Sequence, residues 1–428
     1  MKTQKMYYLL LLIFLNSCIP HDPIPPPPPI NKHENILKAN NIWSSEFKID
    51  TTLFSVNSTF IKPLIIGNKV VFQNWQYSKS EKEFRNESFY IYDRFSGKEL
   101  ARFQPGYYKR FPYPFTSYAD RYLLVNLVRN GGFYCYDLEN LSLNWKINSD
   151  FGEIYGRPEV HGKYAYYKKV FGRVADSIQV KRVDIITGET ERIFSISKNQ
   201  IKDYYIFLDV PNIITNENND IIYYCTMEGL PYVDGPSIVN YRGILAYNIT
   251  KRKMLWITEI EKQTSLSARA PVIYNNLIIF AGDKDVYAYN RFNGTQVWKS
   301  KMPDMEFNGF GFTRILLAYD KLFVKSDNFE LYCLNPENGN VVWINLNCGA
   351  AWAQNRMEYL DQILYFSSGS HKIHAIDMNT GKILWEERSP YKHPYGEFSW
   401  SGLELDKEEK IIYISDDSRA LAFKLPKK

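Results

Sequence analysis

Five cationic residues fall near the start of short apolar runs that alternate as β-strands do: Lys62, Arg157, Arg269, Arg314 and Arg356. If these runs are the innermost strands of a ring of sheets, their ends meet around one axis. Five positive charges near one opening would then favour an acidic partner surface. The alignment of the five differs by one residue, so two alternatives stay open. The side chains are either solvated strand ends or turned into the interfaces between sheets.

Other residue types that perform chemistry form no familiar pattern. His371 and His374 are three apart in an expected strand, where that spacing points them to opposite faces. The adjacent acids Asp416 and Asp417 fall in an expected turn. The sequence has no Gly-rich phosphate loop, no Gly-x-Ser-x-Gly and no His-Glu-x-x-His. We therefore expect no catalytic residue, no metal site and no cofactor.

A repeat of about 45 residues must position these residues. An Asp or Asn that opens a turn recurs at Asp93, Asp137, Asp184, Asn248, Asn290, Asn335 and Asp377, with spacings of 44, 47, 64, 42, 45 and 42 residues. Gly follows four residues later at Gly97, Gly188, Gly294, Gly339 and Gly381, where it suits the positive φ of a tight loop. Trp follows eight residues later at Trp145, Trp256, Trp298, Trp343 and Trp385. A small residue precedes the anchor by two at Cys135, Ala246, Ala288, Cys333 and Ala375.

The two ends of the repeat region complete each other. Residues 420–424 match the strand that precedes each turn, but no Trp-bearing strand follows them. Residues 41–47 contain Trp43 and supply one. This period, with four short strands per unit, predicts an all-β, eight-bladed β-propeller of four-stranded antiparallel blades, closed by pairing of the N- and C-terminal strands.

The motif Ala-x-Asp-x-x-x-Gly-x-x-x-Trp, best kept over residues 375–385, resembles the tryptophan-docking repeat of quinoprotein-like (PQQ-like repeat) propellers. That family includes pyrroloquinoline-quinone dehydrogenases and the outer-membrane protein assembly factor BamB, a periplasmic lipoprotein scaffold. The resemblance implies that Trp43 and the five repeat Trp residues dock between blades. The dehydrogenases resemble one another in a calcium site, a catalytic Asp and often adjacent cysteines, and no Cys-Cys pair occurs here. Three Trp residues outside the repeat are candidates to line the axis: Trp75, Trp352 and Trp400.

The first 36 residues predict targeting to the cell envelope. Lys2 and Lys5 precede a short apolar run, and residues 15–18 resemble a lipobox. We therefore expect a signal peptide over 1–17, a lipid on Cys18, a Pro-rich tether over 18–36 and the propeller over 37–428. A lipid anchor of this kind predicts a protein at the bacterial outer membrane, facing the periplasm. Polyproline II conformation would make the tether a semi-rigid spacer.

The remaining features bear on partners. The net charge is only +5, so nothing indicates nucleic-acid binding. The 64-residue spacing adds about 19 residues to blade four, between Asp203 and Gly243, and such extra length goes to loops on one face of a repeat protein. We expect a monomeric, non-catalytic, membrane-anchored scaffold that binds protein, similar to BamB. The alternatives are a quinone-dependent dehydrogenase and a glycan- or substrate-binding lipoprotein.

Overall fold

The computed structural model describes residues 36–48, 54–58, 62–78, 83–105, 114–127, 132–148, 153–170, 177–197, 205–230, 241–260, 270–282, 284–303, 312–326, 329–350, 356–391, 398, 402–416 and 418–426. The expected signal peptide, Cys18, Trp352, Trp400 and Arg269 lie outside these residues. The expected tether over 18–36 lies outside them as well, apart from its last residue. The propeller unit begins at Ile36.

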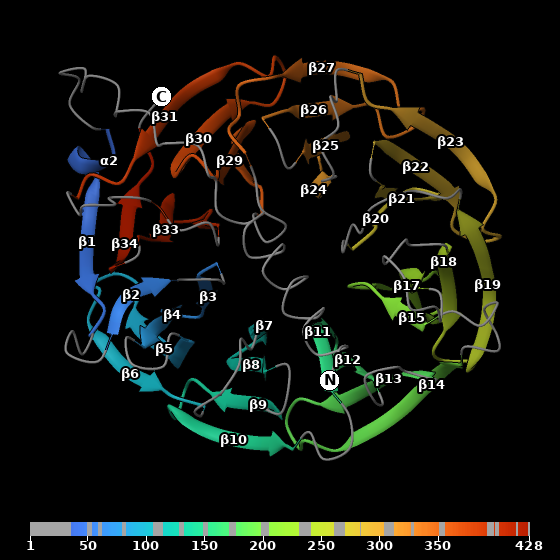
Figure 1. The fold of residues 1–428 in the computed structure, drawn as a ribbon, viewed down its shortest axis with the longest axis horizontal. Coiled ribbons are helices and arrows are strands. Elements are labelled where there is room, and N and C mark those ends of the chain that lie inside the picture. The colour runs from blue at the N-terminus through green and yellow to red at the C-terminus, as the bar shows by residue number, and fades with distance from the viewer. Residues whose placement is uncertain are drawn as a thin grey trace, which may run out of the picture. The chain divides into compact units, whose positions relative to one another are not determined.

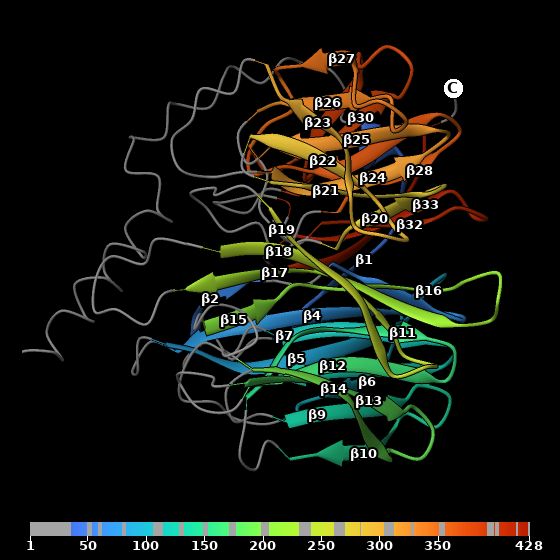
Figure 2. The same cartoon turned by 90° about the vertical axis from the view of Figure 1, so that its right-hand side faces the viewer.

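Eight antiparallel sheets follow one another in chain order around a ring, which confirms the predicted eight-bladed propeller (Figure 1). Six sheets have four strands, and two have a fifth because their innermost position is divided between two short strands. The inner strands are seen almost end-on in Figure 1, whereas the outer strands run along the rim, as the right-handed twist of sheets requires. In the view from the side the strands run across the thickness of the ring (Figure 2).

The blades are built from the following strands. Blade 1 contains β2 (Phe54–Ser58), β3 (Leu64–Ile66), β4 (Lys69–Ser78), β5 (Glu83–Asp93) and β6 (Glu99–Phe103), and blade 2 contains β7 (Pro114–Ala119), β8 (Tyr122–Leu127), β9 (Gly132–Asp137) and β10 (Ser142–Ile147). Blade 3 contains β11 (Glu153–His161), β12 (Tyr164–Val170), β13 (Ser177–Asp184) and β14 (Thr190–Ser197). Blade 4 contains β15 (Tyr205–Leu208), β16 (Asn212–Thr215), β17 (Ile221–Leu230), β18 (Tyr241–Asn248) and β19 (Lys253–Ile260).

The second half of the ring is more regular. Blade 5 contains β20 (Val272–Tyr274), β21 (Leu277–Ala281), β22 (Asp285–Asn290) and β23 (Gln296–Lys301), and blade 6 contains β24 (Phe312–Ala318), β25 (Lys321–Ser326), β26 (Leu331–Leu334) and β27 (Val341–Asn345). Blade 7 contains β28 (Glu358–Leu360), β29 (Ile363–Ser367), β30 (Lys372–Asp377) and β31 (Ile383–Arg388). Blade 8 contains β32 (Glu404–Asp406), β33 (Ile411–Ser415), β34 (Arg419–Lys424) and β1 (Asn41–Glu46).

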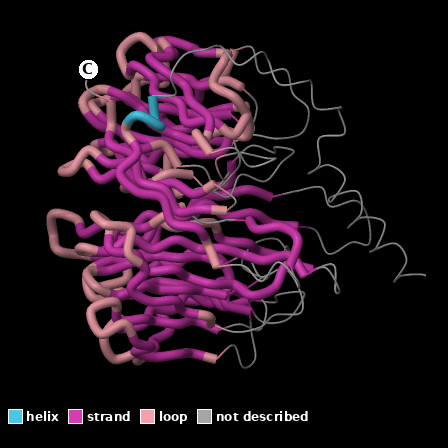
Figure 3. The backbone as a smooth tube through the Cα atoms, turned by 90° about the vertical axis from the view of Figure 1, so that its left-hand side faces the viewer, coloured by secondary structure: helices cyan, strands magenta, loops and turns pink. Residues whose placement is uncertain are grey.

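Strands β1 and β34 close the ring, as predicted. They pair antiparallel, with Trp43 opposite Ala422 and Glu46 opposite Arg419. The described part of the chain is almost entirely strand and loop, with a single helix, α2 (Ile36–Ala39), drawn in cyan in Figure 3. No helix in this part has the length and hydrophobicity needed to cross a membrane.

The core is divided into one hydrophobic cluster for each interface between neighbouring blades. The alternation of each strand explains this, because successive side chains of one sheet face the two neighbouring blades. The cluster between blades 8 and 1 contains Trp43, Tyr92 and Tyr413, so the blade completed by both chain ends is packed like the others.

The turn that opens each repeat is built as its sequence predicts. The carboxylate of Asp377 accepts the backbone N–H of Asn379 at 2.9 Å and of Thr380 at 2.8 Å. The N–H of Gly381 donates to the carbonyl of Asp377 at 2.8 Å. Asp93, Asp184 and Asn290 make the same pair of side-chain contacts in their own turns.

The small residue before each anchor makes room for the Trp of its own blade. It lies directly across the strand pair from the Trp of its own blade, as Ala288 does from Trp298 and Cys333 does from Trp343. Cross-strand partners share one sheet face, so a small side chain leaves room for the indole. Blade 1 reverses the sizes, since Ile91 lies opposite Ala101, which replaces Trp.

Each turn glycine faces the Trp of the preceding blade. A Cβ on Gly97, Gly188, Gly294, Gly339 or Gly381 would lie 2.5–2.8 Å from the indole of Trp43, Trp145, Trp256, Trp298 or Trp343, respectively. The indole N–H of each of these five Trp residues also donates to a backbone carbonyl of that turn, at 2.8–3.2 Å. Trp385 faces the blade that contains both chain ends and packs against the cluster formed by Ile412, Leu421 and Phe423.

The positive φ of the turn does not by itself require glycine. Leu141 and Arg252 occupy the same turn position in blades 2 and 4, and each has a φ of 51°. The blades before them have no Trp at the docking position, because Ala101 and Arg192 stand there. Glycine is therefore present where an indole covers the turn and is replaced where none does.

Two blades depart from the predicted four-stranded form. The innermost position of blade 1 begins at Phe54 and is divided, because β2 and β3 pair with successive parts of β4. The extra residues of blade 4 do not all go to loops. They divide the innermost position into β15 and β16 and lengthen β17, while residues 231–240 lie outside the described residues.

Candidate functional site at the propeller axis

The innermost strands bring most of the predicted cations to one level around the axis. Lys62, Arg157, Arg314 and Arg356 each lie four residues before the last inner residue of their blades, namely Ile66, His161, Ala318 and Leu360. Arg269 is offset by one from this level, where Ala270 stands, and lies outside the described residues. Strands β3, β11 and β24, which follow or contain Lys62, Arg157 and Arg314, lie around the centre of Figure 1.

Lys62 connects three blades through two carboxylates. Its Nζ lies 2.7 Å from Glu358 Oε1 on β28 and also contacts Glu404 Oε2 on β32. The three side chains are 10–20 % exposed. Blades 7, 8 and 1 are therefore joined at the axis by a largely buried ion cluster, and Lys62 is not available as an open cation.

The charges of the three side chains explain the pKa values of Glu404 and Lys62. Two carboxylates share one ammonium, so one of them is left without full compensation. Burial raises the pKa of Glu404 to about 6, with the neighbouring Glu358 adding to the effect and Lys62 opposing it. Burial alone would lower the pKa of Lys62, but the two carboxylates outweigh it and raise that pKa. The cluster binds an extra proton near pH 6 on Glu404, while Lys62 stays charged.

Blades 2 and 3 bring three more polar groups toward this cluster. Arg157 interacts electrostatically with Glu159 and Glu404, and Tyr118 interacts with both carboxylates of the cluster. Burial lowers the pKa of Arg157, and its Nε has no hydrogen-bond partner in the described part of the chain. Arg157 thus contributes positive charge near Glu404 and Glu159 without forming an ion pair among the described residues.

The other predicted cations are less constrained by the structure. Arg356 is half-buried directly before β28, and no ion pair is formed by it within the described ranges. Arg314 lies on β24, and its side chain lies outside the described part. The structure therefore brings Lys62 and Arg157 into one electrostatic network, with Glu358, Glu404 and Glu159 as its acids.

The acids of this network were missed from the sequence. Glu358 and Glu404 are single charged residues in otherwise apolar segments, Met357–Leu360 and Leu403–Leu405. A lone carboxylate among apolar residues of an inner strand is a signal of burial and pairing. Its partner could not be identified, because Lys62 is separated from the two acids by 296 and 342 residues.

Glu358 and Glu404, the acids at the axis, can be compared with the ligands that a calcium-bound quinone requires. Such a centre needs carboxylate and amide oxygens directed at a divalent ion. Glu358 and Glu404 already contact an ammonium, and Trp75 is buried within blade 1 rather than lining the axis. No group of three His, Cys, Asp or Glu side chains suited to a metal occurs in the described ranges. The residues present there do not fit this centre.

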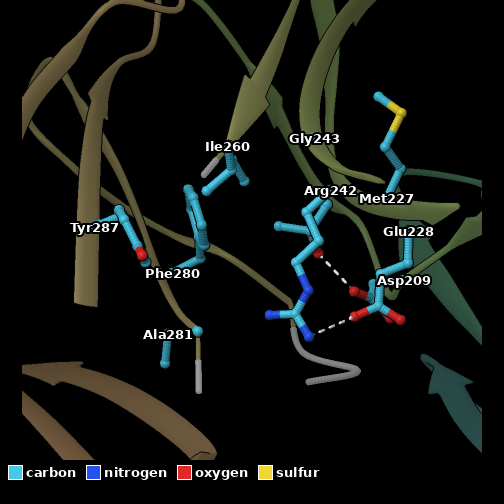
Figure 4. A pocket seen from close by; sticks show the side chains of 11 residues that line it. Asp209, Met227, Glu228, Arg242, Gly243, Ile260, Phe280, Ala281 and Tyr287 are labelled. Atoms are coloured by element: carbon cyan, nitrogen blue, oxygen red, sulfur yellow. Dashed lines mark hydrogen bonds and ion pairs between the residues drawn. The ribbon is translucent and has the colours of Figure 1, made fainter. Parts of the chain in front are cut away.

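A small cavity lies between blades 4 and 5 (Figure 4). Glu228 and Arg242 approach to 3.4 Å on one side of it, and Thr226 donates to the carboxylate of Asp209 at 2.8 Å. Ile260 and Phe280 form its apolar wall. Its volume is about 20 Å³. A space of this size holds roughly one water molecule, so it suits internal solvation rather than an organic ligand.

Blade 7 contains a serine, a histidine and a glutamate in the order of a nucleophilic triad. Ser368 Oγ lies 2.8 Å from His374 Nε2, and His374 Nδ1 lies 3.4 Å from Glu386 Oε2. Ser368 and His374 are 0 % and 1 % exposed, so the hydroxyl cannot reach a substrate. Burial lowers the pKa of His374 to about 4, which makes it a weak base. The arrangement is therefore a buried hydrogen bond between Ser368 and His374 with Glu386 close to the ring, since His374 Nδ1 has no hydrogen-bond partner among the described residues.

We expect His374 to make the fold sensitive to acid. Its pKa in the folded state lies below the ordinary value of 6.5, so the unfolded chain takes up its proton first and stability is lost as the pH falls below about 6.5. The contribution amounts to about 2 kcal/mol between pH 7 and pH 5. Urea denaturation of His374→Gln across this range should show a shallower dependence on pH than wild type. The matched variant His371→Gln should follow the wild-type slope, and equal slopes for all three proteins would contradict the assignment.

The four cysteines in the described part of the chain are buried free thiols: Cys135, Cys225, Cys333 and Cys348. Burial raises the pKa of each to about 12. A thiol with so high a pKa is unreactive at neutral pH, so these residues act as compact core residues.

Comparisons with known proteins agree with this fold. Residues 240–402 match the family model described as outer membrane protein assembly factor BamB. A tetrathionate hydrolase of Acidithiobacillus ferrooxidans is 29 % identical in an alignment of 177 residues that covers 36 % of this chain and 34 % of the hydrolase. The match therefore spans about a third of that relative.

Solved structures extend the likeness to most of the chain. The quinohemoprotein alcohol dehydrogenase of Comamonas testosteroni aligns with a TM-score of 0.62 at 10 % identity, over 92 % of this chain and 79 % of its own. A europium-containing methanol dehydrogenase aligns with a TM-score of 0.59 at 10 % identity, over 90 % and 87 %. At these identities the likeness concerns the fold alone. Together the family model and the eight-bladed fold confirm the resemblance of this chain to the quinoprotein-like propellers that include BamB.

Proposed function

We propose that this protein is a non-catalytic scaffold of the bacterial cell envelope that binds a protein partner. The observation that carries the proposal is the match of residues 240–402, most of the second half of the ring, to the family of outer membrane protein assembly factor BamB. In the proposed arrangement a lipid on Cys18 holds the propeller at the outer membrane, facing the periplasm. The partner contributes to outer-membrane protein assembly, as the family description of BamB indicates.

The geometry of the axis supports a binding role. The Lys62–Glu358–Glu404 cluster joins three blades and supports a rigid ring, which is what a scaffold requires. Arg157 and Arg356 have no ion pair in the described part of the chain, so their charge remains for an acidic partner segment. A quinone-dependent dehydrogenase is less well supported, because Glu358 and Glu404 at the axis already contact Lys62.

A second candidate is hydrolysis of a sulfur compound. The segment shared with tetrathionate hydrolase favours it, although this segment is only about a third of that enzyme. Incubation of the purified protein with tetrathionate, followed by measurement of the remaining substrate, separates the two proposals. Turnover would support the enzyme and contradict the non-catalytic scaffold.

The scaffold proposal is tested by affinity capture of the full-length lipidated protein from solubilised membranes. We expect co-purification of an envelope protein whose binding weakens as salt is raised. Replacement of both Arg314 and Arg356 by Glu should weaken capture on the order of tenfold, because it reverses charge beside the axis. Lys253→Glu, on the outer strand β19, is the matched control and should bind like wild type. The proposal is contradicted if no envelope protein co-purifies above the amount captured by an unrelated lipoprotein. It is also contradicted if the Arg314 and Arg356 double variant and Lys253→Glu capture the partner equally.

A further inference from the structure

Blade 3 gathers three cationic residues on one face of its sheet. Lys169 lies on β12, Lys181 on β13 and Arg192 on β14. Lys181 is the direct cross-strand partner of both Tyr167 and Arg192, and Lys169 is the partner of Gln179. Since cross-strand partners point to the same face, the three cations are neighbours on it.

The packing of blade 3 identifies this face. Tyr167 and Val183 share it and belong to the cluster that joins blades 2 and 3. Phe133 of blade 2 packs edge-on against Tyr167, with ring centroids 5.4 Å apart. The cations thus lie beside the interface with blade 2. Lys181 is half-buried there and Arg192 is exposed.

The same two strands carry opposite charge patterns on their two faces. On the face toward blade 4, Arg182 lies across from Glu191 and forms an ion pair with it at 2.6 Å. On the face toward blade 2, Lys181 lies across from Arg192. Like charges directly opposite one another destabilise a sheet. No carboxylate within the described ranges lies at ion-pair distance from Lys181 or Arg192, so no described residue compensates this repulsion by an ion pair.

The pKa of Lys181 reflects the excess of positive charge around it. Burial lowers the pKa of Lys181, and the charges of Lys169 and Arg192 lower it further. The adjacent cross-strand pair, Gln179 and Ser195, places an amide and a hydroxyl on the same face. A planar guanidinium, an ammonium and neutral donors are the groups that proteins use to bind phosphate.

We propose that this face of blade 3 binds a phosphate-bearing ligand, with Lys181 and Arg192 as the principal contacts and Lys169 beside them. A tetrahedral dianion accepts hydrogen bonds from both cations and removes the repulsion between them. The chemistry is common to a free phosphate monoester and to a phospholipid headgroup. The site lies away from the axis and does not depend on the proposed scaffold role.

The test uses the full chain with Cys18→Ser, so that no lipid anchor contributes to binding. Thermal unfolding is measured in sodium phosphate and in sodium chloride at equal ionic strength, and affinity for inorganic phosphate is measured by calorimetry. Sedimentation with phosphatidic acid vesicles, compared with phosphatidylcholine vesicles, detects a headgroup as the source of the phosphate. Binding in either arm supports the proposal and identifies the source. Binding in neither arm overturns it.

Variants locate the site. We expect Lys181→Gln and Arg192→Gln each to weaken binding about tenfold, the equivalent of one lost charge-assisted contact. In chloride each variant should unfold at the wild-type temperature or above it, because the repulsion is removed. Lys163→Gln on the same blade is the control, since Lys163 pairs with Asp184 at 3.0 Å. Unchanged phosphate binding by the double variant Lys181→Gln with Arg192→Gln, or equal weakening by Lys163→Gln, would overturn the proposal.

Discussion

Replacement of Lys62 by methionine is expected to lower the free energy of unfolding by about 3–5 kcal/mol at pH 7.5, the cost of leaving buried charges without their partner. The variant keeps the apolar stem of the side chain but leaves the carboxylates of Glu358 and Glu404 facing each other. Both are mostly buried, so water cannot replace the ammonium. Urea denaturation followed by Trp fluorescence gives the measurement.

The dependence on pH distinguishes this effect from a loss of packing. The pKa of Glu404 in the folded state is about 6, above its ordinary value of 4.5. Its contribution to stability is therefore present below about pH 4.5 and is lost as the pH rises through about 6. At pH 5 the protonated Glu404 no longer repels Glu358, so we expect Lys62→Met to be less damaging by about 1–2 kcal/mol at pH 5 than at pH 8.

Two further variants keep this prediction testable. Lys62→Met with Glu404→Gln removes the uncompensated charge and should regain most of the lost stability, even if the single variant does not fold. Lys410→Met removes the ammonium of an exposed pair with Asp361, at 2.9 Å, and should cost less than about 1 kcal/mol. An equal loss in Lys62→Met and Lys410→Met, or the same loss at pH 5 and pH 8, would contradict a buried, proton-sensitive cluster.

The cluster shows which part of the site the sequence could predict. The inner-strand cations were found because each strand lies next to a recognisable turn, such as Gly67–Asn68 before Lys69. The acids that neutralise Lys62 lie on other blades, and no spacing in the chain relates them. Local patterns thus predict the position of a side chain in its own strand, whereas its partner depends on how the ring closes.

The repeat was predictable for a related reason. Its turns are fixed by contacts within a few residues, as in the bonds from Asn379 and Thr380 to Asp377. The pairing of each Trp with the next glycine is also present in the sequence, but only when neighbouring blades are compared. The Trp of blade 1 and the glycine of blade 2 are replaced together, by Ala101 and Leu141, as are the Trp of blade 3 and the glycine of blade 4, by Arg192 and Arg252. The division of the innermost position of blade 4 into β15 and β16 could not be predicted, because the extra residues there follow no repeat.

Gly381→Ala is expected to lower the free energy of unfolding by about 2–4 kcal/mol, through overpacking and through strain at a positive φ. The new Cβ would lie 2.5 Å from the indole of Trp343, and the φ of 71° is unfavourable for alanine. That indole is held in place because its N–H donates to the carbonyl of Met378 at 3.2 Å and Cys333 lies opposite it. Urea denaturation gives the measurement.

A comparison of turns separates the indole from the backbone. Arg252→Ala changes the same turn position at a φ of 51°, where no Trp faces the turn, and should cost less than about 1 kcal/mol. In a background of Trp343→Ala, the added cost of Gly381→Ala should fall to the backbone strain alone, about 1 kcal/mol. The difference between the two backgrounds is the coupling between a blade and the turn of its neighbour. If Gly381→Ala costs the same with and without Trp343, then backbone conformation, not the indole, requires glycine in these five turns.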